Sequence, residues 1–322
     1  MGHSSYSTAA YAARVNTARS TGTDYFSHTA DIDSGRQAAH VHEKLDPAGL
    51  NRLGRNVRES RDSAEHPTSR AVVVVFDVTG SMARVPRLFV ERLGGLMQLL
   101  RQKQYIADPQ VMMAAVGDAT CDKVPLQFGQ YESGNEMDEA LSLIHLEGGG
   151  GSLNTESYEL AMYYLARHTE LDCVEKRGQK AYLFLIGDEV PYPRVKKREV
   201  EKVIGDVLQE DIPLTVILTE LRAKYNVYWI LPGQTSNWSD QEVGDRLTEL
   251  FGQHLIRLSN PRDICETIAA TIGLGEGVDI TAVRTDLTSA ADADVAAVGR
   301  ATDALAGLIR PRLINVADLP PA

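Results

Sequence analysis

Short apolar runs alternate with longer segments of helical periodicity from residue 71 to residue 275. The run AVVVVF at 71–76 is apolar throughout and rich in β-branched residues, which is typical of a parallel strand covered on both faces. The run AYLFLI at 181–186 has the same character. Further strands are expected at 111–116, 227–231 and 254–258, and helices at 85–103, 137–145, 156–168, 195–208, 216–225, 241–251 and 261–272. This alternation predicts an α/β fold with a mostly parallel central sheet, right-handed crossovers and helices on both faces.

The pattern changes on both sides of this region, which divides the chain into an N-terminal extension (1–70), an α/β domain (71–275) and a C-terminal tail (276–322). The extension is poor in aliphatic residues, so we expect it to be largely irregular. An arginine at every third position from Arg52 to Arg61 predicts a short helix over 50–62 with the arginines on one side. That side is either an anion- or partner-binding stripe or, because acidic residues lie among the arginines, a solvated surface. In the tail we expect one amphipathic helix over 295–309.

Composition and charge narrow the class of protein. The 322 residues include 44 Asp and Glu against 33 Lys and Arg, a formal net charge of −11, which argues against general nucleic-acid binding or attachment to an anionic membrane. No stretch approaches the roughly 18 apolar residues of a membrane span, and the first thirty residues contain no apolar segment typical of a secretory signal. The three cysteines are widely spaced and form no CxxC pair, so neither a zinc ribbon nor a disulfide framework is expected. We therefore expect a cytoplasmic protein.

Polar residues follow the predicted strands at positions that could form one site. Ligands of an open parallel sheet bind beyond the carboxyl ends of its strands, so the loops at those ends belong together. Asp77, Thr79 and Ser81 alternate after the strand at 71–76, and GDE at 187–189 follows the strand at 181–186. Between them, a run of four glycines at 148–151 leads into SLNT at 152–155. The candidate ligands are Asp77, Thr79, Ser81, Thr155 and Asp188, with Ser152 and Asp118 as further candidates.

These side chains offer hard oxygen ligands and no imidazole or thiolate. Hydroxyl and carboxylate oxygens fit Mg²⁺ best, with Mn²⁺ or Ca²⁺ as substitutes. Mg²⁺ takes six oxygens at about 2.1 Å and usually keeps several waters, so three such loops leave room for waters and one ligand from outside. A carboxylate or a phosphate of a partner is the natural last donor, since it adds negative charge to an ion that few protein carboxylates offset.

The same residues carry a family resemblance. FDVTGSM after an apolar strand, a glycine-rich turn with Ser and Thr, and the later LIGDE together resemble a von Willebrand factor type A (vWA) domain of the intracellular, bacterial type. The resemblance covers about 71–275 and implies a Rossmann-like sheet with a metal-ion-dependent adhesion site (MIDAS). It also implies that Thr79 and Ser81 contact the ion directly and that Asp77 and Asp188 act mostly through water. The second loop, GGGGSLNTES, departs from the family's usual pattern, so Thr155 is the first choice there and Ser152 the second.

Each candidate also has a simpler interpretation. Thr79, Ser81 and Thr155 could be helix N-caps, and Asp188 a turn residue. Asp118, after the strand at 111–116, either orients a ligand or water or is an exposed loop acid before a hairpin at 124–129. The coincidence of all these residues at one sheet edge favours the metal site.

The sequence therefore predicts a metal-dependent binding module that captures an Asp or Glu of a protein partner. Intracellular proteins that this chain resembles are adaptors, often beside AAA-type ATPases. The alternative is a Mg²⁺-dependent phosphatase, since Asp77 with Gly117, Asp118 and Asp122 resembles the haloacid-dehalogenase pattern. Thr79 stands where those enzymes generally place an acid, only about forty residues separate Asp77 from Gly117, and the GDE loop would have no role. A third alternative is a scaffold with an inert site.

Overall fold

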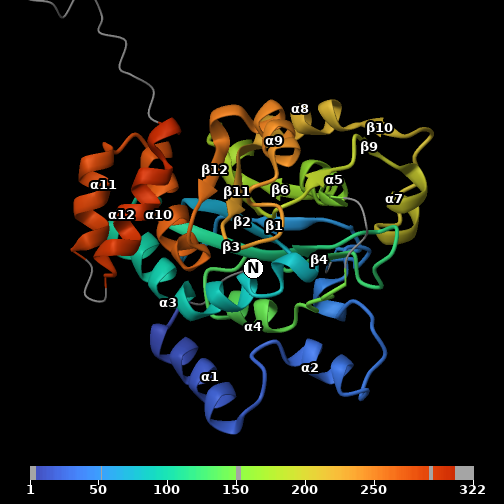
Figure 1. The fold of residues 1–322 in the computed structure, drawn as a ribbon, viewed down its shortest axis with the longest axis horizontal. Helices are drawn as coiled ribbons and strands as arrows, with labels where there is room; N and C mark the ends of the chain where they lie inside the picture. Colours follow the sequence, from blue (N-terminus) through green and yellow to red (C-terminus); the bar gives the residue numbers. More distant parts are fainter. Residues whose placement is uncertain (1–4, 52, 150–153, 290–292, 309–322) are drawn as a thin grey trace, which may run out of the picture.

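The computed structural model describes residues 5–51, 53–149, 154–289 and 293–308 of the chain. Its centre is a six-stranded sheet in the order β12-β11-β7-β2-β3-β4, in which all neighbours run parallel except β3 and the edge strand β4. The strands are β2 (Ser69–Asp77), β3 (Asp108–Val116), β4 (Leu126–Phe128), β7 (Ala181–Ile186), β11 (Tyr225–Pro232) and β12 (Leu255–Leu258). This confirms the predicted α/β fold with a mostly parallel sheet, and Figure 1 shows helices on both sides of it.

Helices cover the sheet at nearly all the predicted places. They are α3 (Val85–Lys103), α4 (Glu136–Ser142), α5 (Tyr158–Arg167), α6 (Asp172–Glu175), α7 (Lys197–Val203), α8 (Leu214–Lys224), α9 (Gln241–Phe251) and α10 (Ile264–Gly275), with 3-10 turns η2 (Gly80–Met82), η3 (Gly252–His254) and η4 (Pro261–Asp263). The helix expected over 195–208 is shorter, because the chain turns at Gly205, whose φ is +95°. Short strand pairs lie outside the main sheet: β1 (Arg58–Ser60) with β6 (Thr169–Leu171), β5 (Thr155–Glu156) with β8 (Val190–Pro191), and β9 (Arg194–Val195) with β10 (Ile212–Pro213).

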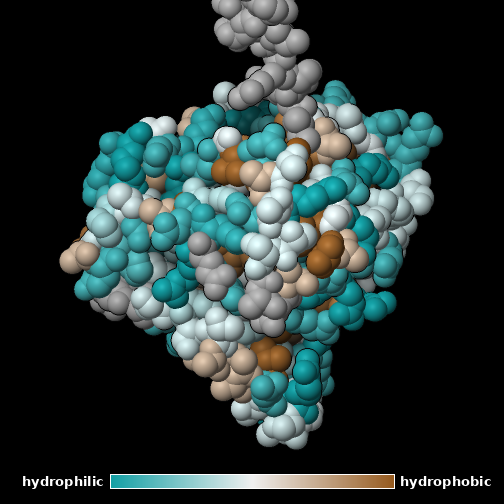
Figure 2. Space-filling view, turned by 90° about the vertical axis from the view of Figure 1, so that its left-hand side faces the viewer, coloured by the Kyte–Doolittle hydropathy of each residue, from teal (hydrophilic) through white to brown (hydrophobic). Residues whose placement is uncertain are grey.

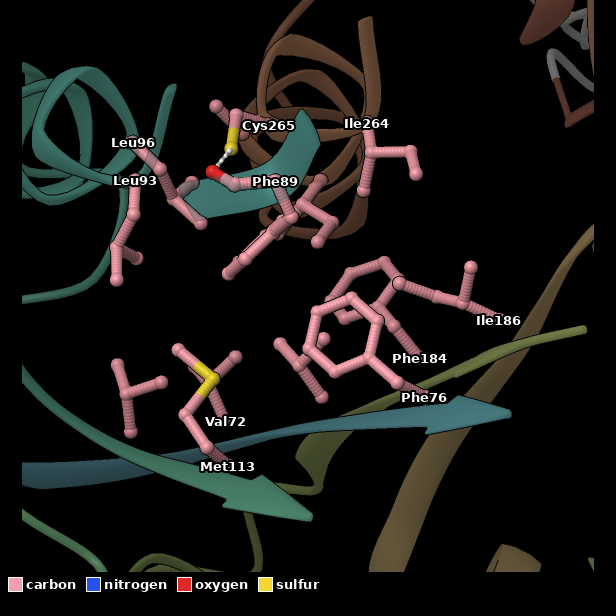
Figure 3. Packing of buried hydrophobic residues seen from close by; sticks show 14 of the residues in the cluster. Val72, Phe76, Phe89, Leu93, Leu96, Met113, Phe184, Ile186, Ile264 and Cys265 are labelled. Carbon is pink, nitrogen blue, oxygen red and sulfur yellow. Dashed lines mark hydrogen bonds between the residues drawn. The ribbon is translucent and has the colours of Figure 1, made fainter. Parts of the chain in front are cut away.

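The all-apolar strands are explained by two hydrophobic cores. Alternate side chains of a strand point to opposite faces, so Val72, Val74 and Phe76 of β2 pack against α3 and α10, while Val73 and Val75 join the core under α5, α8 and α9. The close-up in Figure 3 shows the first of these cores, with Phe76 and Phe184 from the sheet facing residues of α3 and α10. Every residue of β2 is buried, which confirms a strand covered on both faces.

The helix α3 contains two adjacent glycines, for which the sequence predicts close packing against a neighbour. This is confirmed at Gly94, where a Cβ would lie 3.1 Å from the ring of Tyr11. At Gly95 a Cβ would meet no heavy atom within 4 Å. Packing therefore explains one glycine and leaves the other unexplained.

The N-terminal segment is more ordered than its aliphatic content suggests. It contains α1 (Thr8–Thr21), α2 (Ser27–Asp33) and the 3-10 turn η1 (Glu43–Leu45), and α1 packs against α3. The side chains that bury this segment against the domain are mainly aromatic: Tyr6, Tyr11 and Phe26 are buried, together with Leu45. Large aromatic side chains bury much surface each, so a few of them dock a segment that has little Leu, Ile or Val.

The arginine-rich helix expected over 50–62 is wrong. Residues 58–60 form β1 instead, paired in parallel with β6. Arg58 is buried and donates hydrogen bonds to the carbonyls of Gly129, Gly49 and Asp46. Arg61 is tied to the acids Glu59, Glu170, Asp172 and Glu175. The described arginines therefore form no stripe on one helix face, and tertiary pairing has decided the local structure.

The C-terminal segment adds two helices to the same side as α10. These are α11 (Ile280–Thr288) and α12 (Val295–Ala304), followed by the 3-10 turn η5 (Ala306–Leu308). Val298, Ala301 and Leu305 are buried as the predicted amphipathic pattern requires, whereas Val295 is exposed. The predicted last residue of this helix, Ile309, lies outside the described residues. Across the described part of the chain, no helix combines the length and the apolar character needed to cross a bilayer.

Candidate functional site

Three loops meet at the carboxyl edge of the sheet. The register pairs Phe76 of β2 with Ile186 of β7, so the residues that follow each strand leave from the same edge. The glycine-rich segment joins them through its backbone, because Gly148 N donates to Val78 O at 3.1 Å and Gly80 N donates to Gly149 O. A Cβ on Gly80 would lie 3.1 Å from Gly149 O, so glycine permits this close approach of two backbones.

Asp77 is the buried centre of the first loop. Its Oδ1 accepts hydrogen bonds from the backbone N of Thr79 at 2.8 Å and from Thr79 Oγ1 at 2.6 Å. Its Oδ2 accepts a hydrogen bond from the hydroxyl of Tyr158 at 2.6 Å. Asp77 is 0% exposed, and this network fixes both the turn after β2 and the start of α5 against it.

A second hydrogen bond joins loops that are far apart in the sequence. Ser81 Oγ donates to Asp188 Oδ1 at 2.6 Å, across a separation of 107 residues. Asp188 Oδ2 accepts from the backbone N of Asn237 at 3.1 Å, which adds the loop after β11. Asp188 also acts on Asp77 electrostatically, since it contributes to the raised pKa of that carboxyl group. The structure therefore brings Asp77, Thr79, Ser81 and Asp188 together at one edge.

Gly187 makes room for this arrangement. A Cβ at this position would overlap the hydroxyl oxygen of Tyr158 and would lie 2.6 Å from its Cζ. Tyr158 is itself held by Trp229, with ring centroids 4.6 Å apart, and Trp229 Nε1 donates to Gly187 O at 2.9 Å. The glycine of GDE thus lets an aromatic side chain reach Asp77.

The second loop is joined to the segment after GDE by a short strand pair. Thr155 lies in β5, paired with Val190 of β8, and a hydrogen bond from its side chain partly offsets the burial that raises the pKa of Tyr192. No hydrogen bond joins Thr155 to Asp77, Ser81 or Asp188 in the described residues. Successive residues of a strand point to opposite sides, and it is Glu156 that lies within electrostatic reach of Asp77. Ser152 lies outside the described residues.

Asp118 is buried, so the interpretation as an exposed loop acid is wrong. Its oxygens accept hydrogen bonds from Thr120 N at 2.9 Å, Thr120 Oγ1 at 2.7 Å, Tyr192 OH at 3.1 Å and Ser157 Oγ at 3.4 Å. This turn repeats the Asp-x-Thr arrangement of Asp77. Because these donors come from three separate segments, Asp118 positions the second loop and Tyr192 rather than presenting a free oxygen.

The edge brings together buried carboxyl groups whose ionisation its hydrogen bonds do not fully stabilise. Burial, and then Asp77 and Glu189, raise the pKa of Glu156 to about 10. Burial, followed by Asp77 and Asp188, raises the pKa of Glu189 to about 8, and burial raises that of Asp77 to about 6 despite the hydrogen bonds from Thr79 and Tyr158. Glu156 is 0% exposed, and neither of its carboxyl oxygens has a hydrogen-bond partner of good geometry among the described residues. A cation at this edge would stabilise the ionised form of these carboxyl groups.

The donor set fits a hard ion that is held largely by hydroxyls. In the described part of the chain, no three Asp, Glu, His or Cys side chains are grouped so that they alone could hold a metal. An ion would therefore depend on Thr79 and Ser81. Each of these hydroxyls donates its hydrogen to a carboxylate, which leaves its oxygen lone pairs free to bind a cation. Ser81 is partly exposed and Gly80 is exposed, so the edge can be reached from solvent there.

Sequence reasoning missed two contributors, Tyr158 and the backbone of Asn237. Tyr158 stands where the pattern indicates an apolar helix face, and only the packing of α5 shows that its hydroxyl reaches Asp77. The adjacent glycine and aspartate at 187–188 were a usable signal, because a glycine before a buried acid often marks a close approach of another group. No comparable signal marks Asn237.

Comparisons with known proteins give structural neighbours only. No protein-family model and no curated protein matches this sequence. Similar solved structures include the pilus adhesin SpaC from Lactobacillus rhamnosus GG, at 11% identity and a TM-score of 0.44 over 65% of this chain and 30% of that one. Others are proximal thread matrix protein 1 from the mussel byssus (10% identity, TM-score 0.37, 64% and 47%) and a von Willebrand factor type A protein from Catenulispora acidiphila (13% identity, TM-score 0.37, 65% and 43%). The chain spans less than half the length of each of these proteins.

Proposed function

We propose that this chain is a metal-dependent protein-binding module whose MIDAS-like site takes Mg²⁺, or Mn²⁺ or Ca²⁺ in its place, and captures an Asp or Glu of a partner. The observation that carries the proposal is the 2.6 Å hydrogen bond from Ser81 to Asp188, beside the equally short one from Thr79 to Asp77. Two hydroxyls from one turn are thereby oriented by two carboxylates from different strands. The sequence resemblance implies that these same four residues serve a metal site.

The proposed site contains direct ligands of the ion and residues that orient those ligands. Thr79 and Ser81 would hold it through their hydroxyl oxygens, and Asp77 and Asp188 keep those hydroxyls in orientation. Tyr158 fixes Asp77 from the side of α5. When bound, the ion would supply a positive charge with a coordination position left for an outside oxygen.

The surrounding acids explain why binding would require the metal. Burial and then Asp77 raise the pKa of both Glu156 and Glu189, so an additional carboxylate from a partner would meet the same unfavourable negative charge. A divalent cation reverses the sign of that interaction. Removal of the ion should therefore abolish capture of an acidic partner rather than merely weaken it.

An intracellular location belongs to the same proposal. Cys121 is exposed while Cys173 and Cys265 are buried, and all three are free thiols, which suits a reducing compartment. The resemblance to intracellular bacterial members of the vWA family points to an adaptor in the cytoplasm, with a component of an AAA-type ATPase complex as the kind of partner. The supporting facts are the motif and the free cysteines.

The hydrolase alternative has less support at Asp77. A nucleophilic carboxylate must present an oxygen to its substrate. Both oxygens of Asp77 accept hydrogen bonds, and the residue is fully buried. Asp122, which the phosphatase pattern would place at the ion, accepts a hydrogen bond from the backbone of Asp118 instead. Hydrolysis of para-nitrophenyl phosphate that is lost in Asp77→Asn would reverse this preference.

Affinity capture from an extract of the source cells tests the binding function. Partners should be retained in Mg²⁺, released by EDTA and regained when Mg²⁺ is restored. Asp77→Ala should capture nothing above background, because it removes the group that orients Thr79. Asp245→Ala, an exposed acid on α9, is the matched control and should behave as the wild type. Equal capture in EDTA would contradict the proposal, and a folded protein that captures nothing in either condition would favour the inert scaffold.

A further inference from the structure

A cavity of about 340 Å³ lies between α1, α3, α10 and α12, and none of its lining residues belongs to the candidate metal site. Its size falls in the range of small-molecule sites, which runs from about 300 Å³ upwards. Apolar side chains make up much of the wall, among them Tyr11, Val15, Leu96, Leu99 and Val298. Figure 2 faces this side of the molecule and shows apolar residues gathered low in the view, at the level of α1 in Figure 1.

The unexplained glycine of α3 lines this cavity. A Cβ on Gly95 would meet no heavy atom within 4 Å, whereas Gly94 is needed for the approach of Tyr11. Glycine in the middle of a helix weakens it relative to alanine. The chain therefore keeps a helix-weakening residue at a place where a side chain would fill the hollow without a clash.

The polar part of the wall contains a buried acid with one unpartnered oxygen. Glu266 is only 8% exposed, and its Oε2 has no hydrogen-bond partner among the described residues. The nearest cation is Arg92, whose Nε lies 4.0 Å from Glu266 Oε1. Arg92 is instead engaged with Asp294, at 2.7 Å. Burial raises the pKa of Glu266, as expected for a carboxyl group that is removed from water without full compensation.

The charge of the lining favours a positively charged occupant. Its charged side chains are the cations Arg19 and Arg92 and the acids Glu91, Glu266 and Asp294. Glu91 is paired with Arg262, and Asp294 with Arg92 at 2.7 Å, so Glu266, which has Arg92 only at 4.0 Å, is the least compensated of the three acids. A buried charge of this kind is stabilised when an opposite charge also donates hydrogen bonds to it.

We propose that this cavity is a binding site for a small organic amine, with an apolar body against Tyr11 and Gly95 and its ammonium group directed at Glu266. The apolar wall takes the body of the ligand, and the unpartnered Oε2 of Glu266 takes the ammonium group. The site is separate from the sheet edge and does not depend on a metal.

Isothermal titration calorimetry with 2-phenylethylamine tests the proposal in the full-length protein, with 2-phenylethanol as a neutral probe of the same size and 3-phenylpropionate as a slightly larger anionic probe. The amine should bind about tenfold or more tightly than the alcohol, because a hydrogen bond to a charged group is stronger than a neutral one, and the acid should bind least. Glu266→Gln should lower amine affinity to that of the alcohol and leave alcohol affinity unchanged. Equal affinities of the three probes in the wild type, or no binding of the amine at millimolar concentration, would overturn the proposal.

A second variant tests the location. Gly95→Leu should fill the cavity, raise the melting temperature and abolish binding of both amine and alcohol. Gly299→Leu is the matched control, since Gly299 also lies in a helix with nothing within 4 Å of a Cβ but does not line the cavity. Amine binding that survives Gly95→Leu would place the ligand elsewhere and overturn the proposal. EDTA should have no effect on amine binding, which keeps this result separate from that of the metal site.

Discussion

Replacing Gly187 by alanine is expected to lower the free energy of unfolding by about 3 kcal/mol, in the upper range for overpacking a rigid core. The new methyl group would overlap the Tyr158 hydroxyl and press on its ring. Tyr158 cannot move aside easily, because it is 0% exposed and packed on Trp229. Urea denaturation followed by circular dichroism measures the change. The hydrogen bond from Tyr158 to Asp77 should be lost as well.

The control for this variant is Gly299→Ala in α12, where a Cβ has open space. It should leave stability unchanged or raise it by up to about 1 kcal/mol, because alanine favours the helix. The backbone at Gly187 is not in the left-handed region, so the contrast reports packing and not strain. Stability of Gly187→Ala within about 0.5 kcal/mol of the wild type, the range of neutral surface changes, would show that Tyr158 does not occupy this position.

Replacing Arg58 by methionine should destabilise the protein by about 4 kcal/mol, because several buried acceptors lose their donor at once. Arg58 is 2% exposed and donates to the carbonyls of Asp46 at 2.7 Å, Gly129 at 3.1 Å and Gly49 at 3.3 Å. Methionine matches much of its apolar volume and supplies no hydrogen bond. The loss should appear as a lower urea midpoint with limited change in slope.

Arg55→Met is the matched control three residues earlier. Arg55 is 44% exposed in its side chain and pairs with Glu59 and Glu170 at the surface, so its loss should change stability by less than about 1 kcal/mol. A solvated arginine stripe would predict small and similar effects for both variants. Equal losses would therefore contradict the buried position of Arg58.

The central sheet was predictable because its strands are apolar on both faces. AVVVVF and AYLFLI satisfy the requirement of a parallel strand between two helical layers, and no long-range information is needed to recognise them. The segment 50–62 was not predictable in the same way. Its arginine spacing suits a helix, but pairing with β6, more than a hundred residues away, makes it extended. The packing of the N-terminal segment was not predictable either. A few aromatic side chains hold it, and they do so only because α3 and α4 provide a surface against which they pack.

Part of the candidate site follows from topology alone. Asp77, Ser81 and Asp188 come together because neighbouring parallel strands end at the same edge. Among the described residues, no hydrogen bond joins Thr155 to these three side chains, and Thr155 lies in the short pairing of β5 with β8. A two-residue strand has no pattern of its own in the sequence, so the pairing of β5 with β8 could not be foreseen.

Electron paramagnetic resonance of Mn²⁺ during equilibrium titration tests most directly whether these loops hold a hard cation. One Mn²⁺ should bind per chain, Mg²⁺ should displace it, and Ser81→Ala should weaken binding at least about tenfold, because a direct oxygen ligand is lost. Ser236→Ala, an exposed serine of the loop after β11, should bind as the wild type does. Free Mn²⁺ throughout the titration of the wild-type protein, or binding that Ser81→Ala leaves intact, would contradict the metal site and leave only an α/β domain with an acidic edge.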